Sequence, residues 1–319
     1  MQKRKLGRYG PEVPPIILGG NVYGWTADET AAFRQLDRAV EAGLHCIDTA
    51  DVYSRWVPGH QGGESETIIG KWLAGSGRRK DVIIATKVGM DMGNGKKGLS
   101  PAYIEQAVEA SLHRLQTDYV DLYQAHSDDQ STLIEDTLAA FDKLIKAGKV
   151  RYIGASNYSG SRLTQAMEAS RKSGSAGYVS LQPHYNLVHR GDFETDLLPV
   201  IRKYEVGVIP YFSLAAGFLT GKYRRDSDPS SAARGSMVKK YFHDQGFAVV
   251  DALTEVADKH RATPGQVALA WLLAQPGVTA PIASATNEKH LDDMIAAANL
   301  QLDDSSIRLL TDVSSSVPA

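Results

Sequence analysis

The sequence lacks several features that would assign it to a common class of protein. Cys46 is the only cysteine in 319 residues, which excludes an intrachain disulfide and a zinc site built from cysteines. No stretch approaches the roughly 20 apolar residues that a membrane helix needs, and the basic N-terminus is not followed by the apolar run of a secretory signal. The net charge of −2 gives no reason to expect nucleic acid or an acidic membrane as a partner. We therefore expect a cytoplasmic protein.

Common nucleotide and metal motifs are also absent. No Gly-x-Gly-x-x-Gly follows a strand-like run, and the glycine-rich segment 93–97 misses the spacing of a phosphate loop. His184 and His189 are close in sequence but lack the spacing of metal ligands, so we expect no metal site.

Short apolar runs alternate with longer stretches of helical spacing. In one such stretch Ile134, Leu138, Phe141 and Ile145 recur on one face, which predicts an amphipathic helix. Another helix is predicted from Thr263, because Thr263 and Gln266 can form a capping box around a proline in the first turn. The strand-like runs are Ile16–Leu18, Cys46–Ile47, Val82–Ile84, Val120–Tyr123, Val150–Ile153, Val179–Leu181, Val206–Tyr211 and Val278–Ala283.

Eight strands separated by helices predict a parallel sheet, and eight is the number that closes a barrel. The expected fold is therefore α/β, a single (β/α)8 TIM barrel in one domain over residues 1–319, with long loops on the C-terminal side of the strands. The segment Lys5–Val13 is typical of a small hairpin that could cover the N-terminal mouth. The polar segment Arg224–Gly246 is predicted to be a long loop, and the tail Ser314–Ala319 to be frayed.

Four reactive side chains follow three neighbouring strands: Asp48, Tyr53, Lys87 and His126. Catalytic groups of such barrels lie at the C-terminal ends of the strands, so we expect these four to converge. A lysine ammonium would lower the pKa of the tyrosine and make it a better proton donor, while the aspartate would hold the lysine charge. The histidine could donate a hydrogen bond to a substrate carbonyl.

Each of the four also has a purely structural interpretation. Asp48 could cap a turn, Tyr53 could be an aromatic on the rim, Lys87 a surface charge, and His126 a satisfied histidine at a strand end. Their position after consecutive strands favours a shared site over these four separate explanations.

At this point the sequence resembles the aldo-keto reductase superfamily. The segment 43–53, which reads GLHCIDTADVY, is similar to the signature of that family. Further matches follow in order over most of the chain, at segments 84–87, 121–126, 148–157 and 217–222. The resemblance implies a barrel that binds an extended nicotinamide cofactor across its mouth, with Tyr53 as general acid in a tetrad with Asp48, Lys87 and His126.

The resemblance also implies the residues around the cofactor. Ser156, Asn157 and Gln182 would hold the carboxamide, and Tyr211 would stack on the nicotinamide ring. The pyrophosphate would be lined by Ser213, Leu214, Gly217 and Lys222, and the adenosine end by Ser284, Thr286 and His290. Gly20 and Asn21 would also contact the cofactor.

Three positions depart from the family pattern. Ser213 stands where proline is usual, Thr286 where many members have a basic residue for the 2′-phosphate, and Met294 where asparagine is common. Threonine cannot reproduce the bidentate grip of arginine on phosphate, although Lys289 or Arg225 could add charge. The expected cofactor is NADPH, with NADH as the alternative.

The expected activity is reversible reduction of an aldehyde or ketone to an alcohol. Trp25, Trp56 and Ser127 are candidates for the substrate pocket, although the two tryptophans could equally pack the barrel mouth. We expect a small-molecule carbonyl substrate and a monomer. Two alternatives stay open: a cofactor-binding regulatory subunit like the potassium-channel β-subunits, which resemble this family, and a lyase or aldolase that uses Lys87 as a Schiff base.

Overall fold

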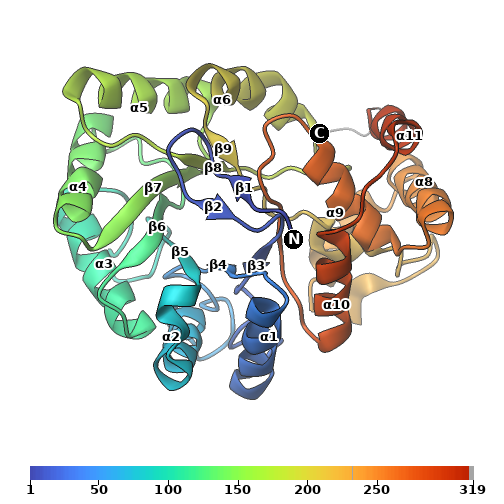
Figure 1. Ribbon diagram of the computed structural model, residues 1–319, viewed down its shortest axis with the longest axis horizontal. Coiled ribbons are helices and arrows are strands. Elements are labelled where there is room, and N and C mark those ends of the chain that lie inside the picture. Colours follow the sequence, from blue (N-terminus) through green and yellow to red (C-terminus); the bar gives the residue numbers. More distant parts are fainter. Residues whose placement is uncertain (232, 316–319) are drawn as a thin grey trace.

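Eight parallel strands form the centre of the computed structural model, which describes residues 1–231 and 233–315 (Figure 1). They are hydrogen-bonded in the order β10-β3-β4-β5-β6-β7-β8-β9. The backbone N–H groups of Thr279 and Ile282 donate to the carbonyls of Val208 and Pro210, so the segment leading into β10 lies beside β9 and closes the ring. This confirms the expected barrel. The strands are β3 (Ile17–Gly19), β4 (Cys46–Asp48), β5 (Ile83–Val88), β6 (Val120–Ala125), β7 (Val150–Ser156), β8 (Ser180–Gln182), β9 (Gly207–Val208) and β10 (Ile282–Ala283).

Helices surround the strands as an outer layer (Figure 1). The helices between the strands are α1 (Glu29–Glu41), α2 (Glu64–Ser76), α3 (Pro101–Leu115), α4 (Ile134–Lys146), α5 (Gly160–Ser173), α6 (Leu198–Tyr204), the single turn α7 (Gly235–Val238), α8 (Asp244–His260) and α9 (Pro264–Ala274). Helices α10 (Glu288–Ala297) and α11 (Asp304–Ser314) follow the last strand, and α11 packs against α8.

Local signals in the sequence account for the positions of these helices. The apolar face of α4 is buried at Ile134, Leu138 and Phe141, because residues three and four apart lie on one side of a helix. At the start of α9, Thr263 accepts from the backbone N–H of Gln266, and the Gln266 side chain accepts from the backbone N–H of Thr263. The predicted capping box is therefore confirmed.

A short hairpin, β1 (Arg4–Lys5) and β2 (Glu12–Val13), covers the N-terminal end of the barrel and lies at the centre of Figure 1. Its Leu6 and Val13 are buried in one apolar cluster with inward-facing residues of the strands, including Ile17 and Leu122. Gly7 has a φ of +62°, and a Cβ there would lie 2.4 Å from the carbonyl oxygen of Val179. The close approach of the hairpin to the barrel floor thus requires glycine. The hairpin thus fills this end of the barrel with apolar side chains.

The predicted long loop Arg224–Gly246 is only partly a loop. It contains the single turn α7, two 3-10 turns at Pro229–Ser231 and Lys239–Tyr241, and the first turn of α8, while position 232 lies outside the described residues. The tail expected to fray begins at Ser314, which is the last residue of α11, and residues 316–319 are not described. The run Val206–Tyr211 is regular strand only at Gly207–Val208.

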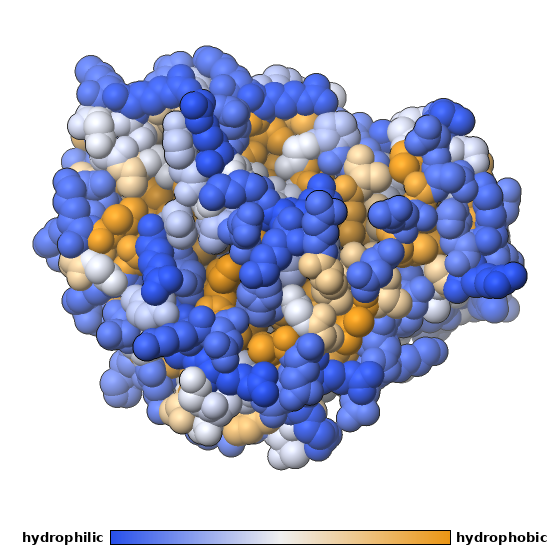
Figure 2. All heavy atoms as spheres, in the orientation of Figure 1, coloured by the Kyte–Doolittle hydropathy of each residue, from blue (hydrophilic) through white to orange (hydrophobic). Residues whose placement is uncertain are grey.

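The outer surface is mostly polar on the face that Figure 2 shows, and apolar residues are visible mainly between hydrophilic side chains. Within residues 1–231 and 233–315, no helix combines the length and the apolar character that crossing a membrane requires.

Candidate active site

The four residues singled out in the sequence lie at adjacent strand ends. Asp48 is the last residue of β4, Tyr53 follows in the next loop, Lys87 is the penultimate residue of β5, and His126 comes directly after β6. Because these three strands are parallel neighbours, their carboxyl ends meet at the same end of the barrel, opposite the hairpin.

Lys87 is at the centre of the cluster and is fully buried. Its ammonium donates to Asp48 Oδ2 over 2.6 Å, to the carbonyl oxygen of Thr49 over 2.8 Å and to Tyr53 Oη over 2.8 Å. An ammonium has three hydrogens to donate, so these three contacts satisfy it.

The other oxygen of Asp48 is also satisfied. Asp48 Oδ1 accepts from Gln124 Nε2 at 3.1 Å and from Gln182 Nε2 at 3.0 Å. A buried ion pair is stable only when its remaining lone pairs have partners, and the two amides supply them. Gln124 was not assigned a role from the sequence, although its position opposite Lys87 in the β5–β6 register could have indicated one.

The charges of this cluster are set by burial and by the ion pair. Burial by itself would lower the pKa of Lys87, but Asp48 and Tyr53 together raise it above its ordinary value, so the ammonium stays charged. For Tyr53, burial raises the pKa more than the neighbouring Lys87 lowers it. The expectation of a lowered tyrosine pKa is therefore wrong: Lys87 acts in the expected direction, but desolvation outweighs it.

His126 lies beside the tyrosine, with ring centroids 5.9 Å apart. Burial and the positive charge of Lys87 hold the pKa of His126 well below its ordinary value, which keeps the imidazole neutral. Its Nδ1 is buried and has no hydrogen-bond partner among the described residues. Ser127, the next residue, is half-buried.

Four residues assigned to the carboxamide and the nicotinamide ring surround the cluster on the β7–β9 side. Tyr211 donates from its hydroxyl to Asn157 Oδ1 at 2.8 Å, and Asn157 Nδ2 donates to the carbonyl oxygen of His126 at 2.9 Å. Ser156 donates to the carbonyl oxygen of Gln182, whose amide reaches Asp48. Asn157 has a φ of +55°, so its backbone is held in the left-handed region at this point.

The residues assigned to the rest of the cofactor divide into local groups. Gly20 donates its backbone N–H to the carbonyl oxygen of Asp48, and Asn21 accepts from Ser284. Thr286 and His290 hydrogen-bond to each other at 2.9 Å, and no direct contact joins this pair to the tetrad within the described part of the chain.

The residues assigned to the pyrophosphate lie in a strained segment after β9, where Phe212, Ala215 and Ala216 have positive φ angles. Gly217 has a φ of +97°, and a Cβ there would lie 3.1 Å from Lys222 Nζ. Ser213 donates to the carbonyl oxygen of Pro210. Leu214 comes after Ser213 and directly precedes the 3-10 turn Ala215–Thr220.

Arg234 lies beside the candidate site and was not singled out from the sequence. It lies in the partly helical segment 224–246, with its guanidinium 5.3 Å from the ring centroid of Trp25, and electrostatic interactions link it to Tyr53 and Lys222. Burial lowers the pKa of both Arg234 and Lys222. Within residues 1–231 and 233–315, neither cation pairs with a carboxylate, and Arg234 Nη2 is buried without a hydrogen-bond partner.

An aromatic wall borders the tyrosine. Trp56 makes edge contacts with Tyr53 at 5.9 Å and with Trp25 at 5.7 Å, and its exposed fraction of 47% leaves it open to solvent. Trp25 also lines a cavity of about 480 Å³ together with His60, in the loop before α2, and Glu64, the first residue of α2.

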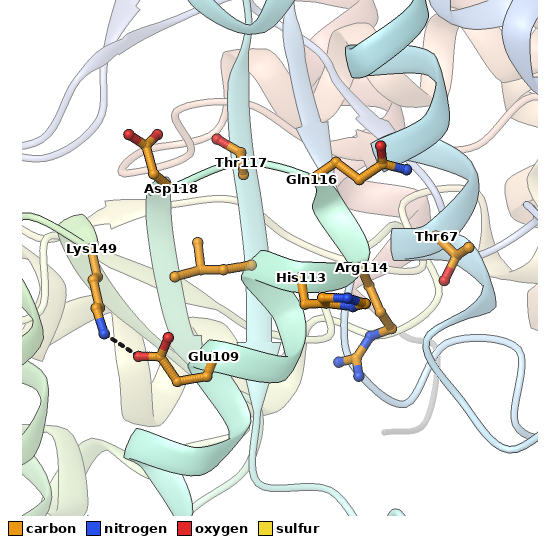
Figure 3. Close-up of a pocket in the computed structure, with 9 residues that line it drawn as sticks. Thr67, Glu109, His113, Arg114, Gln116, Thr117, Asp118 and Lys149 are labelled. Atoms are coloured by element: carbon orange, nitrogen blue, oxygen red, sulfur yellow. Dashed lines mark hydrogen bonds and ion pairs between the residues drawn. The ribbon is translucent and has the colours of Figure 1, made fainter.

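A larger cavity of about 820 Å³ lies elsewhere, along α3 and the segment 116–118 (Figure 3). Lys149 points to Glu109 at one side of it, and none of the residues predicted for the site lines it. No group of three or more His, Cys, Asp or Glu side chains is arranged to hold a metal ion in the described part of the chain. His184 and His189 instead stack on each other.

Comparison with known proteins assigns the chain to a family. The family model described as "Aldo/keto reductase family" matches residues 15–315, so the chain belongs to the aldo/keto reductase family. The chain is 37% identical to "Uncharacterized oxidoreductase YrpG" of Bacillus subtilis, covering 98% of this chain and 96% of that protein.

Two further relatives have different printed names. "Protein tas" of Escherichia coli is 33% identical, covering 95% of this chain and 94% of that protein. A "Probable voltage-gated potassium channel subunit beta" of Arabidopsis thaliana is 32% identical, covering 94% and 92%. The family and the relative named as an oxidoreductase support an oxidoreductase.

Proposed function

We propose that this protein reduces an aldehyde or ketone to the alcohol, reversibly, with hydride from NADPH and a proton from Tyr53. One observation carries the proposal: a buried lysine ammonium contacts both a tyrosine hydroxyl at 2.8 Å and an aspartate carboxylate at 2.6 Å. An ion pair that only stabilises the fold does not require a tyrosine hydroxyl beside it. A tyrosine that donates its proton becomes a phenolate, and a neighbouring cation stabilises this anion.

Each residue then has a defined part in the reaction. Tyr53 is protonated at neutral pH because burial raises its pKa, so its proton is available to the substrate oxygen. Lys87 stabilises the phenolate that this transfer leaves, and Asp48 keeps Lys87 charged. His126 is neutral and can donate one hydrogen bond to the same substrate oxygen, which orients the carbonyl. When bound, the nicotinamide supplies the hydride.

The residues present fit a dinucleotide. Lys222 and Arg234 are two partly desolvated cations that interact with each other and lack a carboxylate partner among the described residues. Two like charges in this situation repel, and an anion such as a pyrophosphate would relieve the repulsion and supply the missing partner of Arg234 Nη2. Gly217 beside Lys222 would leave the backbone open to the phosphates. Ser156, Asn157, Gln182 and Tyr211 would hold the nicotinamide end.

The proposed hydride donor is NADPH, with NADH as the alternative to be compared with it. At the adenosine end, Thr286 donates to or accepts from His290 Nδ1, and Lys289 is the exposed cation next to it. The other candidate cation, Arg225, is already paired with Asp251. A hydroxyl and one lysine bind a 2′-phosphate less firmly than an arginine fork, so we expect the preference for NADPH to be moderate.

The proposal places the enzyme in the cytoplasm as a monomer of one barrel domain acting on a small carbonyl compound. Trp25, Trp56 and Ser127 would line the substrate pocket. A regulatory role like that of the relative named as a channel subunit would use the same cofactor site but would not need turnover, so an activity assay separates the two.

The test is a panel of aldehydes and ketones assayed by loss of the reduced nicotinamide absorbance, with NADPH and NADH in parallel. We expect turnover with some carbonyl compounds and tighter binding of NADPH than of NADH. Binding of NADPH without turnover across aromatic, aliphatic and sugar carbonyls would favour the regulatory role, and absence of binding of either dinucleotide would contradict the proposal.

A further inference from the structure

Tyr211 forms one end of a column of three nearly parallel rings. A parallel β-bridge pairs His184 with Tyr211 and sets their rings side by side, with centroids 5.4 Å apart and planes 20° apart. His184 stacks in turn on His189, at 3.8 Å and 15°. Within the described residues, the only other ring against Tyr211 is that of Phe212, at 57° to it.

The column and one hydrogen bond together restrain Tyr211. Its hydroxyl donates to Asn157 Oδ1, which fixes the hydroxyl end of the ring but leaves the plane free to rotate about the axis from Cβ to the hydroxyl. A parallel ring in contact with it opposes this rotation, because offset-stacked aromatic rings attract each other in that orientation. His184 is itself held from both sides, by the His189 ring and by a 3.3 Å contact between its Nε2 and the Asn186 side chain.

The two imidazoles are neutral, which allows them to stack. Burial, the neighbouring His189 and Lys240 lower the pKa of His184 to about 3. For His189, burial and Lys240 lower the pKa more than Asp192 raises it. At neutral pH the column is therefore a stack of uncharged rings. Another uncharged aromatic side chain at position 184 should preserve this stacking.

We propose that His184 is a positioning residue that fixes the plane of the Tyr211 ring, and through it the plane of the bound nicotinamide. This inference rests on the proposed function, in which the nicotinamide lies on Tyr211. His184 touches neither substrate nor cofactor in this scheme and acts only through Tyr211. Loss of its ring frees Tyr211 to rotate, so that the cofactor binds less tightly and its reacting carbon is held less accurately.

Three substitutions separate stacking from hydrogen bonding at this position. His184→Phe keeps a ring but loses the contact to Asn186, His184→Gln keeps a polar group but loses the ring, and His184→Ala loses both. NADPH affinity is measured by quenching of protein fluorescence, together with kcat at saturating NADPH and the melting temperature. We expect His184→Ala and His184→Gln to weaken NADPH binding by about five- to tenfold and to lower kcat, and His184→Phe to bind within about twofold of the unaltered protein.

The opposite order of effects would overturn the inference: near-normal affinity and kcat in His184→Gln with losses in His184→Phe would assign His184 a hydrogen-bonding role. If His184→Ala does not fold, the Phe and Gln variants still decide the point. The matched control is His45→Phe, since His45 is a half-buried histidine just before β4 whose Nδ1 contacts the carbonyl oxygen of Gly43, and it should change neither constant. Absence of NADPH binding by the unaltered chain would contradict the proposed function itself, whereas normal constants in all three His184 variants would contradict only the role of His184.

Discussion

Replacing Asp51 by asparagine should make the protein more stable, and increasingly so as the pH rises. Asp51 is two residues before Tyr53 and is 2% exposed, and neither of its buried carboxylate oxygens accepts a hydrogen bond of good geometry within the described residues. Burial, followed by the negative charge of Glu66, raises its pKa from 3.8 to about 8, and this outweighs the opposing effects of Arg114, the backbone N–H of Val52 and Lys87. The folded protein therefore keeps this carboxyl protonated at neutral pH.

The sign and size of the effect follow from proton linkage. Below about pH 4 the carboxyl is protonated in both states, so its titration does not change the stability. Between pH 4 and 8 the unfolded chain releases the proton and the folded chain does not, so rising pH favours unfolding by about 1.4 kcal/mol per pH unit. The loss from this residue reaches at most about 6 kcal/mol above pH 8 and then stays constant. Asparagine has a similar shape and cannot titrate, so Asp51→Asn escapes the loss.

The assay is urea unfolding of the two proteins at several values of pH from 4 to 9. The difference in unfolding free energy should grow with pH up to about 8, and all other titrating groups cancel because both proteins share them. Asp258→Asn, at an exposed position of α8, serves as the control and should give a small and constant difference. A difference that does not change with pH, or an Asp51→Asn variant that is less stable at pH 8, would refute the reasoning.

Three further predictions concern the ion pair, the cationic segment and the packing of the helices. Lys87→Met should lower the free energy of unfolding in urea by about 3–5 kcal/mol, because it leaves the buried Asp48 carboxylate without its cation. The same variant should lose most of its turnover, and a stable and active variant would contradict this prediction. Arg234→Ala should weaken NADPH binding by at least about tenfold and reduce its salt dependence in titrations, and unchanged affinity would remove the residue from the site. Gly70→Ala should lower the melting temperature, since a Cβ there would lie 2.0 Å from the backbone oxygen of Arg114, and an unchanged melting temperature would mean that α2 and α3 separate freely.

Much of the fold could be predicted because its signals are local. The capping box at Thr263 and the apolar stripe of α4 depend on residues within one or two helical turns. The alternation of eight strands with helices was sufficient for the barrel, because parallel strands require crossovers. The irregular closure between β9 and β10 could not be predicted, since the hydrogen bonds from Thr279 and Ile282 to Val208 and Pro210 join segments that are distant in sequence.

The positions of most site residues could be predicted from where the strands end, whereas their pKa values could not be predicted from the sequence. Asp48, Lys87 and His126 follow directly from the strand ends, because parallel strands place these ends together. Arg234 could not be predicted, because it reaches the site from a segment without regular spacing. The pKa of Tyr53 depends on how completely the phenol is buried, which the order of residues does not reveal.

The most direct measurement compares Tyr53→Phe with the unaltered protein for both NADPH binding and turnover of the best carbonyl substrate. Phenylalanine keeps the ring against Trp56 and removes only the hydroxyl beside Lys87, so affinity for NADPH should stay within about twofold while kcat falls by about a thousandfold. Tyr9→Phe, at an exposed tyrosine of the N-terminal hairpin, should leave both values unchanged. Wild-type turnover by Tyr53→Phe would contradict the assignment of the proton donor.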